Sequence, residues 1–200
     1  MNKLMLKSKK LLIVEGRDEV EYFEAFFKHL QITEYQIINA GGKDNFQTYI
    51  LSLKALEGFK DVELIGIVRD ADNNAENSFI SVCNSLAKAE LDIPKSNNLF
   101  TSGKIKTGIF IMPGNKKEGM LESLCLQTIE STKEYSCIER FFDCIPGKPK
   151  NIAKSRVQAY LSTREIFVHS LGLAAKKGYW DFEHAVFNEL REFIKIFQET

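Results

Sequence analysis

Two groups of acidic residues follow apolar segments of the chain. Glu15 comes directly after the run LLIV (11–14), and Asp70 and Asp72 stand close behind the run VELIGIV (62–68). Aspartates at such positions could be turn formers or helix caps. Several carboxylates brought together repel one another unless a cation is present. Carboxylate oxygens are the ligands that Mg²⁺ and Mn²⁺ prefer, whereas Zn²⁺ prefers nitrogen and sulfur. These residue types therefore predict a magnesium-type site.

The segments that must position these acids alternate between two patterns. Uninterrupted apolar runs suit strands that are buried on both faces of a parallel sheet, and apolar residues three and four apart suit helices. The predicted strands are KKLLIVEG (9–16), YQIINAGG (35–42), VELIGIV (62–68) and TGIFIMPGN (107–115), and the predicted helices cover 17–30, 43–59, 75–90 and 118–129. This alternation predicts an α/β fold with a mainly parallel sheet of about four strands flanked by helices.

The pattern changes after residue 128, where the remaining segments have helical character. These segments are STKEYSCIERFFDCI (131–145), IAKSRVQAYLSTREIFVHSLGL (152–173) and DFEHAVFNELREFIKIF (181–197), and PGKPKN (146–151) joins the first two. We therefore expect an α/β core over residues 1–128. A helical C-terminal extension over residues 129–200 would pack on this core as a layer or as a small lobe.

A parallel sheet would bring the acids together at one edge. Ligands of such sheets bind beyond the carboxyl ends of the strands. Glu15 ends the first predicted strand, Asp70 and Asp72 follow the third, and Glu118 and Glu122 lie just beyond the fourth. A pair of divalent cations held at this edge could polarise a phosphoryl oxygen, generate hydroxide and stabilise a leaving oxygen.

These segments resemble a TOPRIM domain, the catalytic fold shared by topoisomerases, bacterial primases, small RNA-maturing nucleases and OLD-type nucleases. The resemblance rests on LLIVEGRDEVEYF (11–23), a strand that ends in Glu-Gly, followed by GIVRDADNN (66–74), a strand that ends in Asp-x-Asp. It covers roughly residues 9–128, and the order and spacing make the two motifs more specific together than either is alone. In particular, the chain resembles the compact OLD-like branch, including small bacterial TOPRIM proteins of unassigned function.

The resemblance implies a role for each acid of the two motifs. Glu15 would bind a metal ion and, as in the cleavage–religation relatives, act as a general acid or base. Asp70 would be the central, bridging ligand, and Asp72 would bind the second ion. Asp18 or Glu19 would complete the first metal site, although Asp18 could instead cap its helix and Glu19 could be a solvated residue of the first helical turn.

The resemblance extends to residues outside the two motifs. Glu122, in the Leu121-Glu122 pair after the fourth strand, would complete the second metal site. Lys154, on a downstream helix, would assist the chemistry, although a solvated helix lysine is the alternative. Gly16 would let the backbone turn sharply and leave room for a phosphate.

Several basic residues could contact a nucleic-acid backbone. Lys148, Lys150 and Arg156, together with Lys154, could bind phosphates by releasing counterions, or they could be solvated residues of a connector. Lys43 could contact a phosphate or be an ordinary charge at the start of a helix.

Composition limits the class of protein. Lys+Arg and Asp+Glu both total 27, so the formal net charge is zero, which excludes the basic excess of a non-specific nucleic-acid coat. The four Cys form no zinc-type motif and suggest reduced thiols. No segment approaches the ~18 apolar residues of a membrane span, and Glu15 interrupts the apolar run after the N-terminus. We therefore expect a cytoplasmic protein with neither a span nor a signal peptide.

We expect a Mg²⁺- or Mn²⁺-dependent phosphodiesterase with one or two ions, most simply a nuclease that acts on DNA or RNA. The sequence contains no P-loop, so the ATPase half of a full-length OLD protein is not expected in this chain. One alternative is a non-catalytic TOPRIM module that binds nucleic acid or a nucleotide and acts with a separate partner such as an ATPase. Another is a phosphotransferase or phosphatase with a small substrate.

Overall fold

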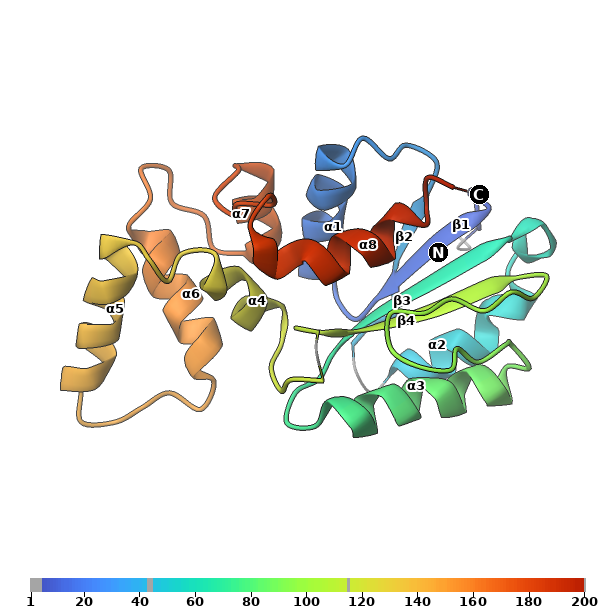
Figure 1. The fold of residues 1–200 in the computed structure, drawn as a ribbon, viewed down its shortest axis with the longest axis horizontal. Helices are drawn as coiled ribbons and strands as arrows, with labels where there is room; N and C mark the ends of the chain where they lie inside the picture. Colours follow the sequence, from blue (N-terminus) through green and yellow to red (C-terminus); the bar gives the residue numbers. More distant parts are fainter. Residues whose placement is uncertain (1–4, 43–44, 115, 200) are drawn as a thin grey trace.

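The centre of the molecule is a four-stranded parallel sheet with the strand order β2-β1-β3-β4 (Figure 1). The computed structural model describes residues 5–42, 45–114 and 116–199 of the chain. The strands are β1 (Lys10–Val14), β2 (Gln36–Asn39), β3 (Leu64–Asp70) and β4 (Lys106–Met112). The predicted α/β class, with a parallel sheet of about four strands flanked by helices, is confirmed.

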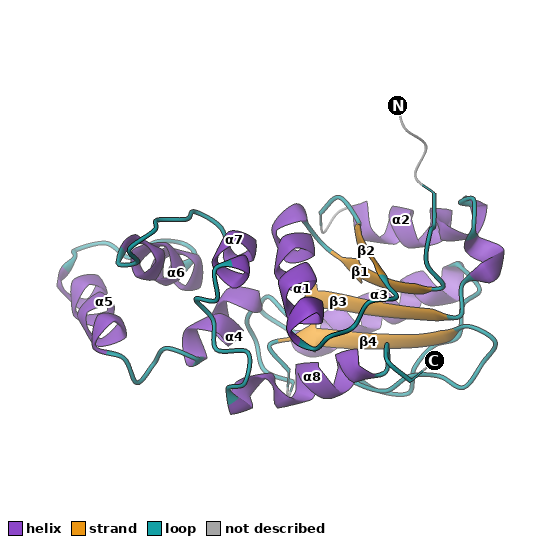
Figure 2. Cartoon of the chain, turned by 90° about the horizontal axis from the view of Figure 1, so that it is seen from above, coloured by secondary structure: helices purple, strands orange, loops and turns teal. Residues whose placement is uncertain are grey.

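Both faces of the sheet are covered, which is why each strand contains a run of apolar residues. In β1, Leu12 and Val14 join the core on one face, while Leu11 and Ile13 join the core on the other. Helices α1 (Arg17–His29) and α8 (Asn188–Lys195) cover the first face, and α2 (Phe46–Ser52) and α3 (Ala75–Lys88) cover the second (Figures 1 and 2).

The strand register sets the level at which each acid leaves the sheet. Ile13 pairs with Ile67 across β1 and β3, so the next positions along the two strands place Glu15 level with Arg69. Asp70 pairs with Met112 at the ends of β3 and β4. The carboxyl ends of the central strands therefore lie side by side at one edge of the sheet.

The second predicted helix is shorter than the sequence pattern indicates. α2 ends at Ser52 and is followed by the 3₁₀ turns η2 (Leu53–Ala55) and η3 (Phe59–Asp61). Between these turns Gly58 has a φ of 90°, and a Cβ atom there would lie 2.3 Å from the backbone oxygen of Leu6. Only glycine fits at this turn, because any side chain would collide with the backbone of Leu6. Helical periodicity in the sequence does not reveal such a contact.

Four helices of the C-terminal half lie beyond the carboxyl ends of the strands, with α5 and α6 furthest from the sheet (Figure 1). They are α4 (Leu121–Gln127), α5 (Lys133–Cys144), α6 (Ile152–Ser162) and α7 (Leu171–Lys176). The prediction of one helix over 152–173 is wrong because an irregular link separates α6 from α7. Ser170 ends this link as the N-cap of α7, and its Oγ accepts the backbone N–H of Leu173 at 3.2 Å.

The last helix returns along the sheet (Figure 2). The helix predicted over 181–197 begins later, with the 3₁₀ turn η4 (Ala185–Phe187), and continues as α8. After α8, the backbone oxygen of Phe197 accepts a hydrogen bond from the buried Nζ of Lys10 at 2.7 Å. Residues 129–200 thus supply α5, α6 and α7 beyond the sheet edge, and α8, which shares one face of the sheet with α1. Among the described helices, each is too short or too polar to cross a bilayer.

Candidate active site

Asp70 is the last residue of β3, and the start of α4 holds its carboxylate. Its Oδ1 accepts a hydrogen bond from the backbone N–H of Leu121 at 3.0 Å. Leu121 is the first residue of α4, and Glu122 follows it. The bond therefore ties the end of the central strand to the helix that carries another predicted ligand.

Asp72 lies in a loop that pairs with the segment before α4. Its N–H donates to the backbone oxygen of Gly119, and the N–H of Gly119 donates to the backbone oxygen of Asp72, both at 2.9 Å. Asp72 has a φ of 51° and Gly119 a φ of 133°, and aspartate tolerates this left-handed region better than most residues. The paired backbones hold the Asp-x-Asp loop against the start of α4.

Glu15 and Glu19 come from the turn between β1 and α1. The side chain of Glu15 is 16% exposed. Glu19 folds back over the turn, so a Cβ atom on Gly16 would lie 2.7 Å from its Oε2. Gly16 itself has an extended backbone, with φ −135° and ψ 179°. The chain nevertheless bends at Glu15 and Gly16, and the space beside this glycine is taken by the carboxylate of Glu19.

Glu122 and Lys154 face each other across α4 and α6. The Nζ of Lys154 lies 3.7 Å from Oε1 of Glu122, and the lysine side chain is 61% exposed while that of Glu122 is 13% exposed. Asn151 caps α6, because its Oδ1 accepts the N–H of Lys154 at 3.0 Å. The cap fixes the first turn of α6, from which Lys154 reaches the acids.

The acids share one electrostatic environment, most clearly at Asp70. Burial raises the pKa of Asp70 well above its usual value, and the charges of Glu15, Glu122 and Glu19 raise it further. Asp72 and Glu19 in turn raise the pKa of Glu15, which burial raises most. We call these residues the acidic cluster: Glu15, Glu19, Asp70, Asp72 and Glu122. Neighbouring carboxylates of the cluster disfavour the ionised forms of Glu15, Asp70 and Glu122, and a bound cation would relieve this repulsion.

Burial also raises the pKa values of Glu19 and Glu122, and the charge of Lys154 lowers both. The lysine is therefore an electrostatic partner of two cluster members from separate elements. Its largely exposed side chain lies on the solvent side of these two acids.

The donors of the acidic cluster suit Mg²⁺ or Mn²⁺ by their chemistry. In the described ranges of the chain, no three His, Cys, Asp or Glu side chains are already grouped around a single point as metal ligands. Mg²⁺ is commonly bound by one or two carboxylates, several waters and the phosphate oxygens of a substrate, so it does not require three preformed protein ligands. The cluster therefore fits such an ion by the type of its donor atoms.

Asp18 has a structural partner that the sequence does not reveal. Its Oδ2 accepts the N–H of Leu171 at 3.0 Å, and its Oδ1 accepts the N–H of Gly172 at 2.8 Å. Asp18 therefore binds the N-terminus of α7 and is not the N-cap of α1, a position that Gly16 occupies. Of the two acids that follow Glu15, Glu19 is the one whose charge acts on both Glu15 and Asp70.

Arg69 is a residue of the site that the two sequence motifs do not predict. It is 8% exposed within β3, and its Nε donates to Oε1 of Glu15 at 3.1 Å. The signal was present in the sequence, because an arginine inside an apolar strand must find a charged or polar partner when it is buried.

The basic residues predicted to bind phosphates differ in their surroundings. Lys148 and Lys150 are exposed in the loop between α5 and α6. Arg156 is engaged elsewhere, because its Nη2 donates to Oε2 of Glu139 at 2.6 Å. Lys43 lies outside the described residues.

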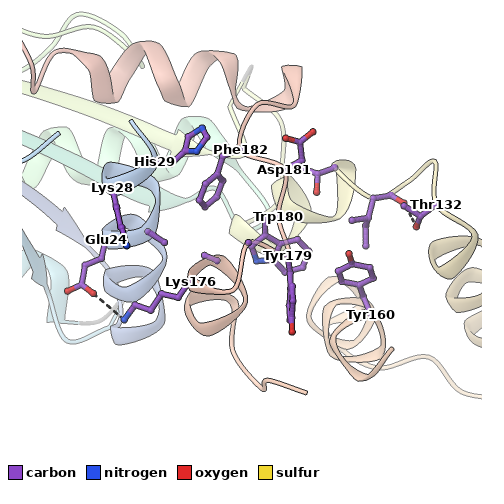
Figure 3. Close-up of a pocket in the computed structure, with 15 residues that line it drawn as sticks. Glu24, Lys28, His29, Thr132, Tyr160, Lys176, Tyr179, Trp180, Asp181 and Phe182 are labelled. Carbon is purple, nitrogen blue, oxygen red and sulfur yellow. Dashed lines mark hydrogen bonds and ion pairs between the residues drawn. The ribbon is translucent and has the colours of Figure 1, made fainter. Parts of the chain in front are cut away.

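A broad depression of about 970 Å³ lies between α1, α6 and the segment after α7 (Figure 3). Glu24, Lys28 and Tyr179 are among its lining residues, and no member of the acidic cluster lines it. Trp180 beneath it is 2% exposed, and its Nε1 donates to the backbone oxygen of Leu171 at 3.3 Å. The grouped acids rather than this depression mark the candidate active site, because carboxylates are the groups that could bind a divalent cation.

Comparison with solved structures shows the same fold in another protein. The C-terminal region of the Xanthomonas campestris pv. campestris OLD protein, in a structure phased with mercury, superposes with a TM-score of 0.52 at 15% identity, over 98% of this chain and 98% of that chain. A second structure of the region, phased with iodine, gives a TM-score of 0.44 at 16% identity, over 98% of this chain and 87% of that chain. No curated protein matches the sequence.

A protein-family model covers nearly the whole chain. The family, described as "Protein of unknown function (DUF3226)", matches residues 9–199, which include both acidic motifs, the helices beyond the sheet edge and α8. The chain belongs to the DUF3226 family.

Proposed function

We propose that the chain is a Mg²⁺- or Mn²⁺-dependent phosphodiesterase of the TOPRIM type, and specifically a nuclease that hydrolyses DNA or RNA. The observation that carries the proposal is the acidic cluster at the carboxyl edge of a parallel sheet, with Asp70 electrostatically coupled to Glu15, Glu19 and Glu122. The Glu-Gly and Asp-x-Asp motifs, and the fold shared with an OLD protein region, support the same reading.

Asp70 would be the central ligand of the cation, with Glu15, Glu19, Asp72 and Glu122 around it. When bound there, one or two divalent ions would supply a Lewis acid and lower the pKa of an attacking water. The hydrogen bond from Leu121 to Asp70 and the paired backbones of Asp72 and Gly119 keep the acids at a common edge before any substrate arrives. Such preorganisation lowers the cost of forming the charged transition state.

Lys154 would contact the substrate at the open side of the cluster. Its Nζ is near Glu122 and its side chain is largely exposed, so it could donate to a non-bridging phosphate oxygen and offset the charge that develops there. Lys148 and Lys150, exposed in the loop before α6, would bind the flanking phosphates of a polynucleotide.

The proposal is tested by a cleavage screen with single-stranded, double-stranded and structured DNA and RNA, in Mg²⁺ or Mn²⁺. Wild type should cleave at least one substrate. Asp70→Asn and Glu15→Gln should each reduce the cleavage rate at least a hundredfold. Both variants should still unfold cooperatively on heating, which would show that they are folded. Asp143→Asn, an exposed aspartate of α5, should cleave as wild type does. Equal activity in wild type, Asp70→Asn and Glu15→Gln would show that the cluster is not catalytic.

A second candidate is a non-catalytic module that binds nucleic acid and acts with a separate partner such as an ATPase. One observation favours it, because the structure with the same fold is a region of a larger protein. Retained binding of Mn²⁺ and nucleic acid without cleavage of any substrate in the screen would select this candidate over the nuclease.

A further inference from the structure

Arg69 is a cation built into the acidic edge that the proposed chemistry does not use. It precedes Asp70 in β3, and its side chain is 10% exposed beside Glu15, whose side chain is 16% exposed. Its Nε donates to Oε1 of Glu15 at 3.1 Å. The charge of Arg69 lowers the pKa of Glu15, against the burial that raises it most.

The guanidinium group of Arg69 is held from two further sides. Its Nη1 donates to Oγ of Ser81 on α3 at 3.1 Å, and its central carbon lies 5.7 Å from the ring centroid of Phe46 on α2. These contacts come from separate helices under the sheet. The guanidinium therefore cannot follow an incoming ion or swing into solvent without losing a hydrogen bond and a cation–π contact.

A fixed positive charge at Glu15 opposes a second positive charge there. A divalent ion that approaches the acidic cluster would share Glu15 with Arg69 and be repelled by it in a medium less polar than water. Truncation of the arginine removes that repulsion and leaves the carboxylate of Glu15 in need of a cation.

We propose that Arg69 is the resident counter-charge of Glu15 and weakens the affinity of the acidic cluster for a divalent cation. The inference rests on the proposed function and deepens it, and Arg69 is a positioning residue because it acts through Glu15. Weak binding of the free ion suits a site in which Mg²⁺ keeps several waters and gains further oxygen ligands from a substrate phosphate.

The test is a titration of the full chain with Mn²⁺ alone, in which the free ion is followed by electron paramagnetic resonance. Arg69→Met removes the charge, and Arg69→Gln removes it while keeping a hydrogen-bond donor, so one variant can replace the other if folding fails. Both should bind Mn²⁺ at least about tenfold more tightly than wild type. Arg69→Lys, which keeps the charge, should stay within about threefold of wild type.

Lys9→Met is the matched control. Lys9 pairs with Glu63 at 2.6 Å at the other end of the same strands, so this variant makes the same change in net charge away from the acidic cluster. Its affinity for Mn²⁺ should equal that of wild type.

Three results would overturn the inference. Unchanged or weaker binding in both neutral variants would contradict it while leaving the proposed function intact, and so would equal tightening in Lys9→Met. A wild-type chain that binds no Mn²⁺ at millimolar concentration would instead remove the proposed metal site, and this inference with it.

Discussion

The Oδ1 atom of Asp70 lies 3.0 Å from the backbone nitrogen of Leu121 and accepts its hydrogen bond. The bond joins the last residue of β3 to the first residue of α4, so an acid whose ionised form is disfavoured is nevertheless held in place by the fold. This combination is expected where a protein keeps a costly charge for its chemistry, and it leads to a prediction about stability.

Asp70→Asn should be more stable than wild type at pH 8 in EDTA, by on the order of 1 kcal/mol. Burial and neighbouring acids raise the pKa of Asp70 in the folded chain. The contribution of Asp70 to folding stability is therefore most favourable below its pKa in the unfolded chain. It is lost as the pH rises through its higher pKa in the folded chain. Asparagine keeps the Oδ1 acceptor for Leu121 and carries no charge. Urea unfolding at several pH values measures the difference, which should shrink toward pH 4.

The exposed Asp143 again serves as the control, because Asp143→Asn should leave the pH dependence of unfolding unchanged. A less stable Asp70→Asn variant at pH 8 would show that the carboxylate is not repelled by its neighbours.

Asp18→Asn should lower stability and spare cation binding. Its carboxylate accepts two N–H groups at the start of α7, and hydrogen bonds to a charged group are stronger than neutral ones. We expect a loss of about 2 kcal/mol in the free energy of unfolding, and Mn²⁺ affinity within about threefold of wild type. Ser170→Ala, which removes only the neutral cap of α7, should cost about 1 kcal/mol. Lost Mn²⁺ binding at unchanged stability would make Asp18 a ligand instead.

Gly172→Ala should destabilise the chain by about 2 kcal/mol, because overpacking a tight contact strains it. A Cβ atom at Gly172 would lie 2.5 Å from Cβ of Glu21 and 2.7 Å from the backbone oxygen of Asp18. Gly147→Ala is the control, since a Cβ atom there meets nothing within 4 Å. Thermal melts of both variants measure the effect, and equal melting temperatures would mean that α1 and α7 are not in close contact.

Lys154→Met should reduce phosphodiester cleavage about a hundredfold, because one donor aimed at developing charge is worth about that much. Lys150→Met, in the exposed loop, should lower the affinity for the substrate and make that affinity less dependent on salt. The maximal rate should change little. Single-turnover rates at saturating substrate separate the two effects. Equal rates in wild type and Lys154→Met would leave Lys154 as an ordinary surface lysine.

The sequence predicted what local patterns and sheet geometry determine. Apolar runs identified the strands, and the parallel order followed from their alternation with helices, so Glu15 and Asp70 could be expected at one edge. The contact between Asp18 and Leu171 joins residues 153 positions apart. Local sequence patterns could not predict it, because it depends on how distant helices pack. The pairing of Arg69 with Glu15 was easier to predict, because the strand register alone places the two residues level with each other.

The decisive measurement is the position of Mn²⁺ in a soaked crystal of the chain. We expect an anomalous peak within about 2.2 Å of a carboxylate oxygen of Asp70, with at least one oxygen of Glu15, Glu19, Asp72 or Glu122 in the same coordination shell. The same soak of Asp70→Asn should show no peak at this position. A peak away from the acidic cluster in wild type, or none at the cluster in a well-ordered crystal, would show that the acidic cluster is not the metal site.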